Sequence, residues 1–290
     1  MPLLLIATLL WAVSFGLIKH YLVGLDPNLI AWVRMALAVP VLLPFLRWHE
    51  LRCWPGPPWR TALRLVGIGA VQYGLMYTGY IASFGFAAAH EVALFTVTTP
   101  IFVVLIHDAH ARRFDAGNLG LASLAVLGAA VLQLRGGAPG GAWLGLALVS
   151  TSNLCFAFGQ VEYRRMRRAA PEARDRAVFV WPYLGGLLVT TLTTSLSGGW
   201  RELPALGANQ IWALLYLGVV ASGLGFFLWN RGAVTAAPAA LAVANNLKIP
   251  LAVVAALTIF GEQAELWRLA IGGGIMVLAA GLATRRGSTA

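Results

Sequence analysis

The chain has 290 residues, of which 59% are hydrophobic and 11% are charged, whereas an average soluble domain has about 25% charged residues. This composition indicates an integral membrane protein and excludes a soluble globular domain. The net charge of +10 is typical of basic cytoplasmic loops in a membrane protein, so we expect no nucleic-acid partner.

Ten segments are apolar over about the 20 residues that a helix needs to cross a bilayer. They are residues 3–22, 27–47, 62–83, 89–107, 118–134, 143–163, 177–197, 208–228, 235–258 and 265–284. The connections between them are short, so we predict an all-α integral membrane protein without a soluble domain. The first segment lacks a basic region and a small-residue cleavage site, and we interpret it as a span rather than a signal peptide.

Basic residues predict the orientation of these spans. If both termini are cytoplasmic, 15 of the 21 Lys and Arg residues lie on the cytoplasmic side, four lie outside, and two lie within spans. Such an excess is the usual sign of cytoplasmic loops. The 15 are Arg47, Arg52, Arg60, Arg64, Arg112, Arg113, Arg164, Arg165, Arg167, Arg168, Arg174, Arg176, Arg231, Arg285 and Arg286.

Ten spans with both ends on one side divide into two halves of five, and an odd number of spans inverts the second half. A shift of 150 residues places Pro250 on Pro100 and Asn246 on Thr96. We therefore predict two inverted five-helix repeats, residues 1–137 and 138–290. Such repeats are typical of transporters that bind their substrate near the membrane centre.

The segment LAVANNLKIPLAVV, residues 241–254, places polar residues inside the ninth predicted span. A lysine at that depth costs about 2.5–3.5 kcal/mol on insertion scales. We expect Lys248 to meet either an anionic substrate or a buried acid, such as Glu91 or Glu162. The amides of Asn245 and Asn246 suit a ligand with N–H and C=O groups, or a neighbouring helix.

Both aligned prolines lie inside predicted spans. Each lacks an N–H, and its ring crowds the carbonyl four residues earlier, so we expect kinks at Pro100 and Pro250. A kink can serve gating or can be a simple feature of packing. The matched pair favours gating.

Further candidate residues lie on other spans. Glu91 begins the fourth span and is either a coupling acid or, as we favour, a first-turn acid at the helix dipole. Arg34 lies in the second span, where snorkelling towards headgroups and contact with a substrate explain it equally well. Polar and aromatic side chains that can line a cavity or join helices are Trp11, Gln72, Tyr73, Tyr77 and Asn153.

Motifs of enzymes and cofactor sites are missing from the sequence. We find no phosphate-binding loop, no HExxH motif and no cysteine pairs at metal-ligand spacing. The aspartates lie at or beyond span ends, so an intramembrane protease is not indicated. We expect neither an enzyme nor a bound cofactor.

The five-plus-five pattern resembles the EamA branch of the drug/metabolite transporter superfamily. Three runs look like its biotin-uptake members: GAVQYGLMYTGYIASFGFAAAHEVALFTVTTPIFVVLIHD (69–108), SNLCFAFGQVEY (152–163) and SGLGFFLWNRGA (222–233). The resemblance implies a multi-pass protein, in contact with membrane lipids, that takes up biotin across the bacterial inner membrane. It also implies alternating access through a central cavity, without an ATPase partner.

Biotin has a carboxylate, an apolar bicyclic body and a ureido group. If biotin is the substrate, its chemistry leads us to expect the carboxylate on Lys248, the ureido group on Asn245, Asn246, Gln72 or Asn153, and the body against Trp11, Tyr73 and Tyr77. Two alternatives stay open: an exporter of amino acids or other small metabolites, and a membrane sensor or scaffold with a vestigial cavity.

Overall fold

The structure, a computed structural model, describes residues 2–110, 112, 116–133, 141–235 and 238–289. Several predictions concern positions outside the described residues. These are the side chains of Asn245 and Asn246, the basic residues Arg113 and Arg135, and the boundary between the repeats at residues 137 and 138.

The described part of the chain is helical and contains no β-strand. Its α-helices follow the predicted spans closely. They are α1 (Pro2–Leu17), α2 (Pro27–Leu42), α3 (Pro58–Gly69), α4 (Met76–Ser83), α5 (Ala89–Phe95), α6 (Thr99–His110), α7 (Ala116–Gln133), α8 (Gly141–Arg168), α9 (Asp175–Val178), α10 (Val180–Ser197), α11 (Ala208–Leu215), α12 (Phe226–Thr235), α13 (Pro238–Thr258) and α14 (Leu266–Thr289).

Helical stretches among the described residues are long and apolar enough to cross a membrane in six cases. They are Pro2–Leu22, Pro27–Phe45, Ala89–His110, Trp143–Arg168, Asp175–Ser197 and Ala208–Ala233. The prediction of an all-α, multi-pass membrane protein is thereby confirmed. The number of ten spans, their inverted repeat and the side of the termini stay predictions.

Several spans depart from regular α-helix. Three contain π-helical segments, η1 (Ile18–Leu22), η4 (Ala70–Leu75) and η7 (Tyr216–Gly225), a feature that is frequent at functional sites. The 3-10 turn η5 (Thr96–Thr98) separates α5 from α6 just before Pro100, where the missing N–H interrupts the helical hydrogen bonds. In contrast, α13 continues through Pro250 as one helix.

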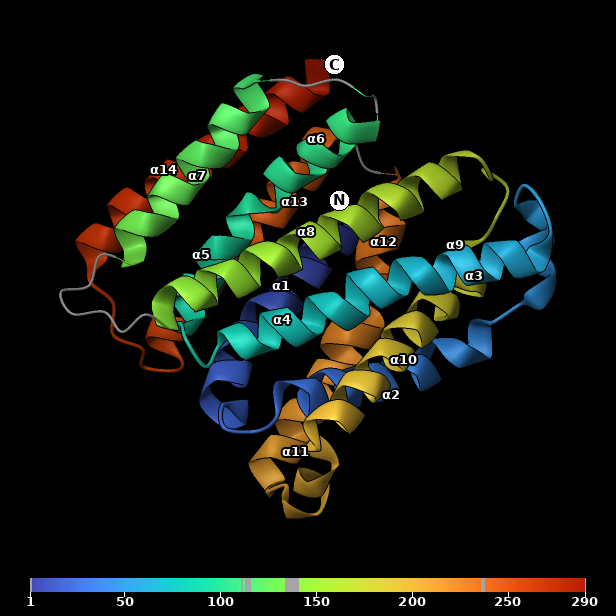
Figure 1. The fold of residues 1–290 in the computed structure, drawn as a ribbon, viewed down its shortest axis with the longest axis horizontal. Helices are drawn as coiled ribbons and strands as arrows, with labels where there is room; N and C mark the ends of the chain where they lie inside the picture. Colours follow the sequence, from blue (N-terminus) through green and yellow to red (C-terminus); the bar gives the residue numbers. More distant parts are fainter. Residues whose placement is uncertain (1, 111, 113–115, 134–140, 236–237, 290) are drawn as a thin grey trace.

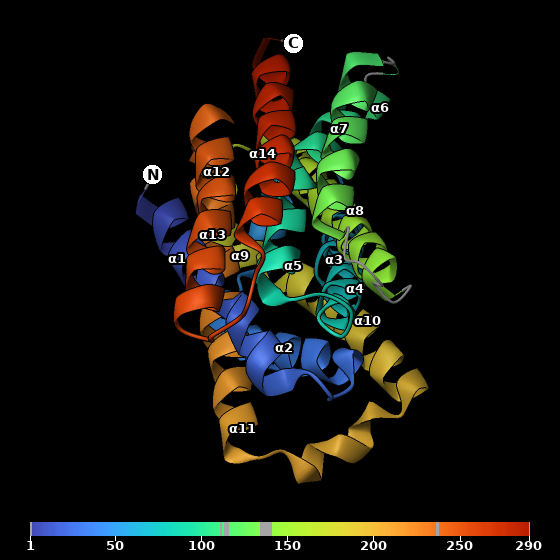
Figure 2. The same cartoon turned by 90° about the vertical axis from the view of Figure 1, so that its left-hand side faces the viewer.

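Figures 1 and 2 show how the helices are arranged. At one edge α7 and α14 lie side by side, on the far side of the bundle from α2, α10 and α11. Towards the centre, α1 packs on α12 and α13, and α8 packs on α4 and α6. The α2 helix contacts η7 and α10, and α10 also contacts α3.

The α3 and α10 helices meet backbone to backbone through glycines. A Cβ atom on Gly69 would lie 1.7 Å from the carbonyl oxygen of Pro182, and one on Gly185 would lie 1.9 Å from that of Val66. Only residues without a side chain permit this approach, which is common between membrane helices.

The segment between α13 and α14 is joined to the start of α5 by one carboxylate. The oxygens of Glu262 accept hydrogen bonds from the backbone N–H of Ala89 at 2.9 Å and of His90 at 3.2 Å, and Oε2 lies 2.7 Å from His90 Nδ1. Burial raises the pKa of Glu262, but the hydrogen bonds from His90 and from the two backbone groups outweigh it, so the net pKa is lowered.

Glu262→Gln should therefore weaken this junction in a pH-dependent way. A carboxylate with a lowered pKa in the folded state stabilises the protein above its unfolded pKa, and this stabilisation is lost as the pH falls through the folded pKa. We expect the variant to have a lower melting temperature in detergent at neutral pH, with a difference from wild type that shrinks on acidification. Glu265→Gln, which changes a half-exposed side chain of the same segment, is the control. A difference that does not vary with pH would contradict the expectation.

Candidate functional site

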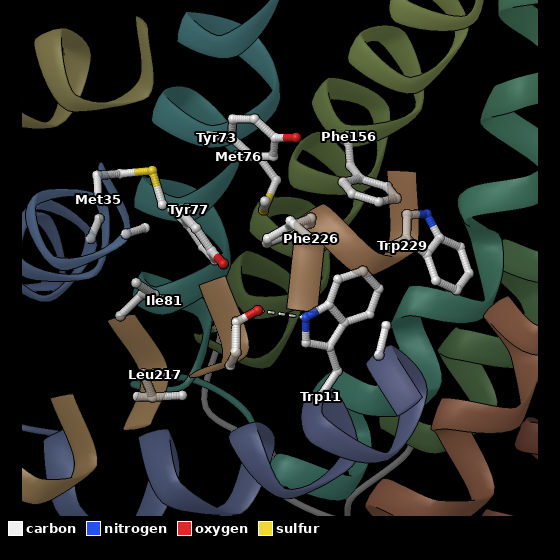
Figure 3. Close-up of a cluster of buried hydrophobic side chains, with 14 of the residues drawn as sticks. Trp11, Met35, Tyr73, Met76, Tyr77, Ile81, Phe156, Leu217, Phe226 and Trp229 are labelled. Atoms are coloured by element: carbon white, nitrogen blue, oxygen red, sulfur yellow. Dashed lines mark hydrogen bonds between the residues drawn. The ribbon is translucent and has the colours of Figure 1, made fainter. Parts of the chain in front are cut away.

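Six aromatic side chains form a buried central aromatic cluster, drawn in Figure 3. Phe226 lies between Tyr77 on one side and Trp11 and Phe156 on the other. Its ring centre is 4.7 Å from that of Trp11, 6.0 Å from that of Tyr77 and 6.0 Å from that of Phe156. The cluster consists of Trp11, Tyr73, Tyr77, Phe156, Phe226 and Trp229.

Local structure fixes two of these rings. Trp11 on α1 donates its indole N–H to the carbonyl of Ala221 at 2.9 Å, the dashed line in Figure 3. Gly225 leaves room for this indole, since a Cβ there would lie 2.8 Å from its nitrogen. Tyr73 on η4 packs 4.9 Å from the ring of Tyr183. The cluster is thus held by π-helical segments of two spans and by α1.

Lys248 on α13 points towards this cluster and away from lipid, because only 8% of it is exposed. Its Nζ atom lies 5.9 Å from the ring centre of Trp11 and 6.0 Å from that of Phe156. Both distances are within the range of a cation–π interaction. The structure therefore places this predicted residue beside two aromatic side chains.

Arg34 on α2 contacts the cluster at Tyr77 and is 2% exposed. Its Nε donates to the Ser222 hydroxyl at 3.1 Å, and its Nη2 donates to the Tyr77 hydroxyl at 2.8 Å. The guanidinium carbon lies 4.1 Å from the ring centre of Tyr77. Nη1 has no hydrogen-bond partner among the described residues. The side chain thus points into the bundle, unlike the snorkelling alternative.

Gln72 and Tyr73 lie together on η4. Gln72 is 2% exposed and its Nε2 lacks a hydrogen-bond partner among the described residues. It packs against α8 at Gly159, where a Cβ would come within 2.3 Å of the Gln72 side chain. The Tyr73 hydroxyl lies 3.4 Å from the Asn230 amide nitrogen. Of these two predicted residues, Tyr73 belongs to the cluster, and Gln72 is its neighbour on η4.

Asn153 on α8 has a different surrounding. Its amide nitrogen donates to the carbonyl of Phe95 and to the hydroxyl of Thr98, both at 2.9 Å. The two N–H groups are used at the 3-10 turn that separates α5 from α6. The sequence predicted either contact with a substrate or contact with a neighbouring helix for Asn153, and these hydrogen bonds are of the second kind.

Asn153→Ala should destabilise the protein by about 1–3 kcal/mol, because it removes two buried hydrogen bonds at the α5–α6 junction. Thermal unfolding in detergent would measure the loss. Ser152→Ala is a matched control, since among the described residues that hydroxyl bonds the Leu148 carbonyl of its own helix and no other group. If both variants melt alike, Asn153 does not hold the junction.

Glu91 lies at the start of α5, where its Oε2 accepts a hydrogen bond from the backbone N–H of Ala88 at 2.9 Å. This is the favoured first-turn role. Glu91 also lines a pocket of about 500 Å³ that is surrounded by His90, Gln263, Ala264, Glu265, Arg268 and Leu269. That pocket includes no member of the central aromatic cluster. Of the aligned prolines, Pro100 is buried and Pro250 is exposed.

Sequence reasoning missed important members of the site, namely Ser222, Asn230, Phe156 and Phe226. Ser222 and Asn230 carried a usable signal. They are polar and lie eight residues apart in the helical stretch Ala208–Ala233, a spacing that is expected to place both near one helix face. The aromatic residues had no such signal, because phenylalanine is common throughout apolar spans.

Comparison with known proteins places the chain in a family. Residues 1–134 match the EamA-like transporter family. The chain is 37% identical over 282 residues to a "Biotin transporter" of Salmonella typhimurium, covering 96% of this chain and 91% of the relative. The chain belongs to the EamA-like transporter family. It is therefore a membrane transporter and not an enzyme.

Two further similarities agree with this membership. A "Probable biotin transporter" of Pseudomonas aeruginosa is 40% identical over 276 residues, which cover 94% of each chain. A crystal structure described only as that of a protein aligns with a TM-score of 0.62 at 19% identity, over 98% of this chain and 96% of the other. The latter shows a shared fold only.

Proposed function

We propose that this EamA-like transporter takes up biotin across the bacterial inner membrane. The observation that carries the proposal is a buried aromatic cluster whose rings are contacted by two buried cations, Arg34 at Tyr77 and Lys248 at Trp11. Biotin has matching chemistry, since it joins an anionic carboxylate to an apolar bicyclic body with a polar ureido group. The relatives named biotin transporters support the same substrate.

The site residues have roles that follow from this chemistry. Trp11, Tyr73 and Tyr77 cover the bicyclic body, and a buried cation takes the carboxylate. Gln72, whose amide nitrogen lacks a partner among the described residues, pairs with the ureido group. Asn245 and Asn246 keep the same proposed role from their position on α13.

Transport by alternating access of two inverted repeats, residues 1–137 and 138–290, is part of the proposal. The helix contacts support it. If the two halves are exchanged, each contact between them should have a counterpart. The α1–α13 contact corresponds to the α8–α6 contact, α1–α12 corresponds to α8–α4, and α2–η7 corresponds to α10–α3, and all six are present. The α5–α13, α2–α10 and α7–α14 contacts map onto themselves. Pairs of this kind are those expected of repeats related by a two-fold axis.

The proposal describes a single polypeptide with both termini in the cytoplasm. It requires membrane lipids, but neither an ATPase partner nor a nucleic acid. Glu91 lies at the start of α5, Pro100 follows the turn between α5 and α6, and Pro250 lies on α13. We assign a role in gating or coupling to these three residues.

Uptake of radiolabelled biotin into proteoliposomes that contain the purified protein tests the proposal. We expect saturable uptake that unlabelled biotin blocks and amino acids do not, with protein-free liposomes as the control. Flux of an amino acid or another metabolite without flux of biotin would favour the exporter alternative. The absence of any saturable flux would favour the sensor or scaffold.

A further inference from the structure

We infer that Arg34, rather than Lys248, binds the carboxylate of the substrate, and that Lys248 meets the polar group at the substrate's other end. This inference rests on the proposed uptake of biotin. It revises the assignment made from the sequence, which placed the carboxylate on Lys248.

The charge of Arg34 is the first reason. Arginine keeps its charge in proteins, and Arg34 lies within the helical stretch Pro27–Phe45, which is long and apolar enough to cross a membrane. Its hydrogen bonds among the described residues go to two hydroxyl groups, those of Ser222 and Tyr77. Neither hydroxyl neutralises a charge, and burying an ion without a counter-charge is energetically costly. An anionic ligand at this position would offset that cost.

The geometry of Arg34 is the second reason. Two nitrogens are held by Ser222 and Tyr77, whose own hydroxyls lie 2.9 Å apart. Ser222 is in turn fixed through its carbonyl, which accepts a hydrogen bond from Tyr183 at 2.6 Å. The guanidinium plane is thus oriented before a ligand binds, and the Nη1 donors are left for it. A planar guanidinium matches a carboxylate better than an ammonium does, because it donates two parallel hydrogen bonds.

Lys248 contacts other rings of the cluster than Arg34 does. Phe226 stands between the rings that contact the two cations, Tyr77 for Arg34 and Trp11 and Phe156 for Lys248 (Figure 3). A substrate whose apolar body occupies this aromatic region presents one polar end to each cation. If its carboxylate meets Arg34, the ammonium of Lys248 is placed to donate to a carbonyl oxygen, such as that of a ureido group.

This arrangement makes Arg34 a specificity-determining residue. Biotin and its neutral amide, biotinamide, share the bicyclic body and the ureido group and differ only at the carboxylate. The wild-type protein should prefer biotin. Removal of the Arg34 guanidinium should abolish that preference. Removal of the Lys248 ammonium should lower the affinity for both ligands by the same factor.

The test measures the half-maximal concentrations at which biotin and biotinamide inhibit radiolabelled biotin uptake in proteoliposomes, for wild type, Arg34→Gln and Lys248→Gln. We expect Arg34→Gln to lower the preference for biotin by about tenfold or more, the ratio that corresponds to 1.4 kcal/mol. Lys248→Gln should leave the preference within about threefold of wild type, because the contributions of separate, independent contacts are nearly additive. For variants that take up too little biotin for this assay, calorimetry measures the binding of both ligands to the detergent-solubilised protein instead.

Other outcomes overturn the inference. Loss of the preference in Lys248→Gln but not in Arg34→Gln would assign the carboxylate to Lys248. If Arg34→Gln lowers the affinity for biotin and for biotinamide equally, the arginine has a structural role instead. If Arg34→Gln does not fold, Ser222→Ala removes one acceptor of the guanidinium, and an unchanged preference in this variant would also count against the inference. Absence of biotin transport by the wild type would instead defeat the proposed function, and the inference with it.

Discussion

Lys248→Ala should reduce biotin uptake by about 30-fold or more, which corresponds to the lower end of the 2–5 kcal/mol lost when one partner of a buried charged contact is removed. The ammonium is 8% exposed and lies near the rings of Trp11 and Phe156. Alanine removes the donor at one end of the proposed substrate site, whichever polar group of biotin it meets. Initial rates of radiolabelled biotin uptake in proteoliposomes measure the effect.

The chain provides a matched control, because Lys19 is the one other lysine in the sequence. Its Nζ donates to the carbonyl of Phe84 at 2.7 Å, and among the described residues it forms no hydrogen bond with the central aromatic cluster. Lys19→Ala should therefore keep nearly full uptake. Equal protein yield and a similar melting temperature would show that Lys248→Ala folds. Full uptake by a folded Lys248→Ala variant would remove this residue from the substrate site.

Gly69→Ala should prevent the normal packing of α3 against α10. The added methyl group would lie 1.7 Å from the carbonyl oxygen of Pro182 and 2.4 Å from its Cα atom, so it meets backbone that cannot rotate away. Inserted atoms in a packed interior commonly cost about 1–3 kcal/mol, and we expect the upper end because both helices must move. Monodisperse yield after size-exclusion chromatography and the melting temperature in detergent measure the loss.

Gly67→Ala tests the same helix two residues earlier. No atom lies within 4 Å of a Cβ built on Gly67, and alanine is favoured over glycine in a helix by about 1 kcal/mol. This variant should be as stable as wild type or slightly more stable. Similar destabilisation by both substitutions would show that helix propensity or lipid contact, rather than the approach to α10, governs this position.

The sequence was a good guide to the elements of the fold, because apolar length and basic loops report directly on the bilayer. The predicted span at residues 177–197, for example, corresponds to α10, Val180–Ser197. Pro100 correctly marked the interruption that the structure shows as η5. The same reasoning did not find the π-helical segments η4 and η7, since an extra residue in a helical turn leaves no residue type that marks it.

For the candidate site, sequence reasoning worked where a polar residue was unusual for its depth. Lys248 and Arg34 were identified in this way, because charge inside a span is costly and therefore informative. It failed for Phe226, whose importance depends on being surrounded by rings from other spans. It was undecided for Asn153, because an amide can serve a substrate or a neighbouring helix equally well.

The sequence by itself determined that this chain is an all-helical, multi-pass membrane protein, since composition, hydrophobic length and charge asymmetry are properties of the chain alone. Only the tertiary structure decided which side chains meet. It brought Arg34 from α2 to Tyr77 from α4 and Ser222 from η7, and it placed Lys248 from α13 beside Trp11 from α1. Contacts between distant spans depend on helix rotation and close packing, which small residues such as Gly69 permit and no local pattern records.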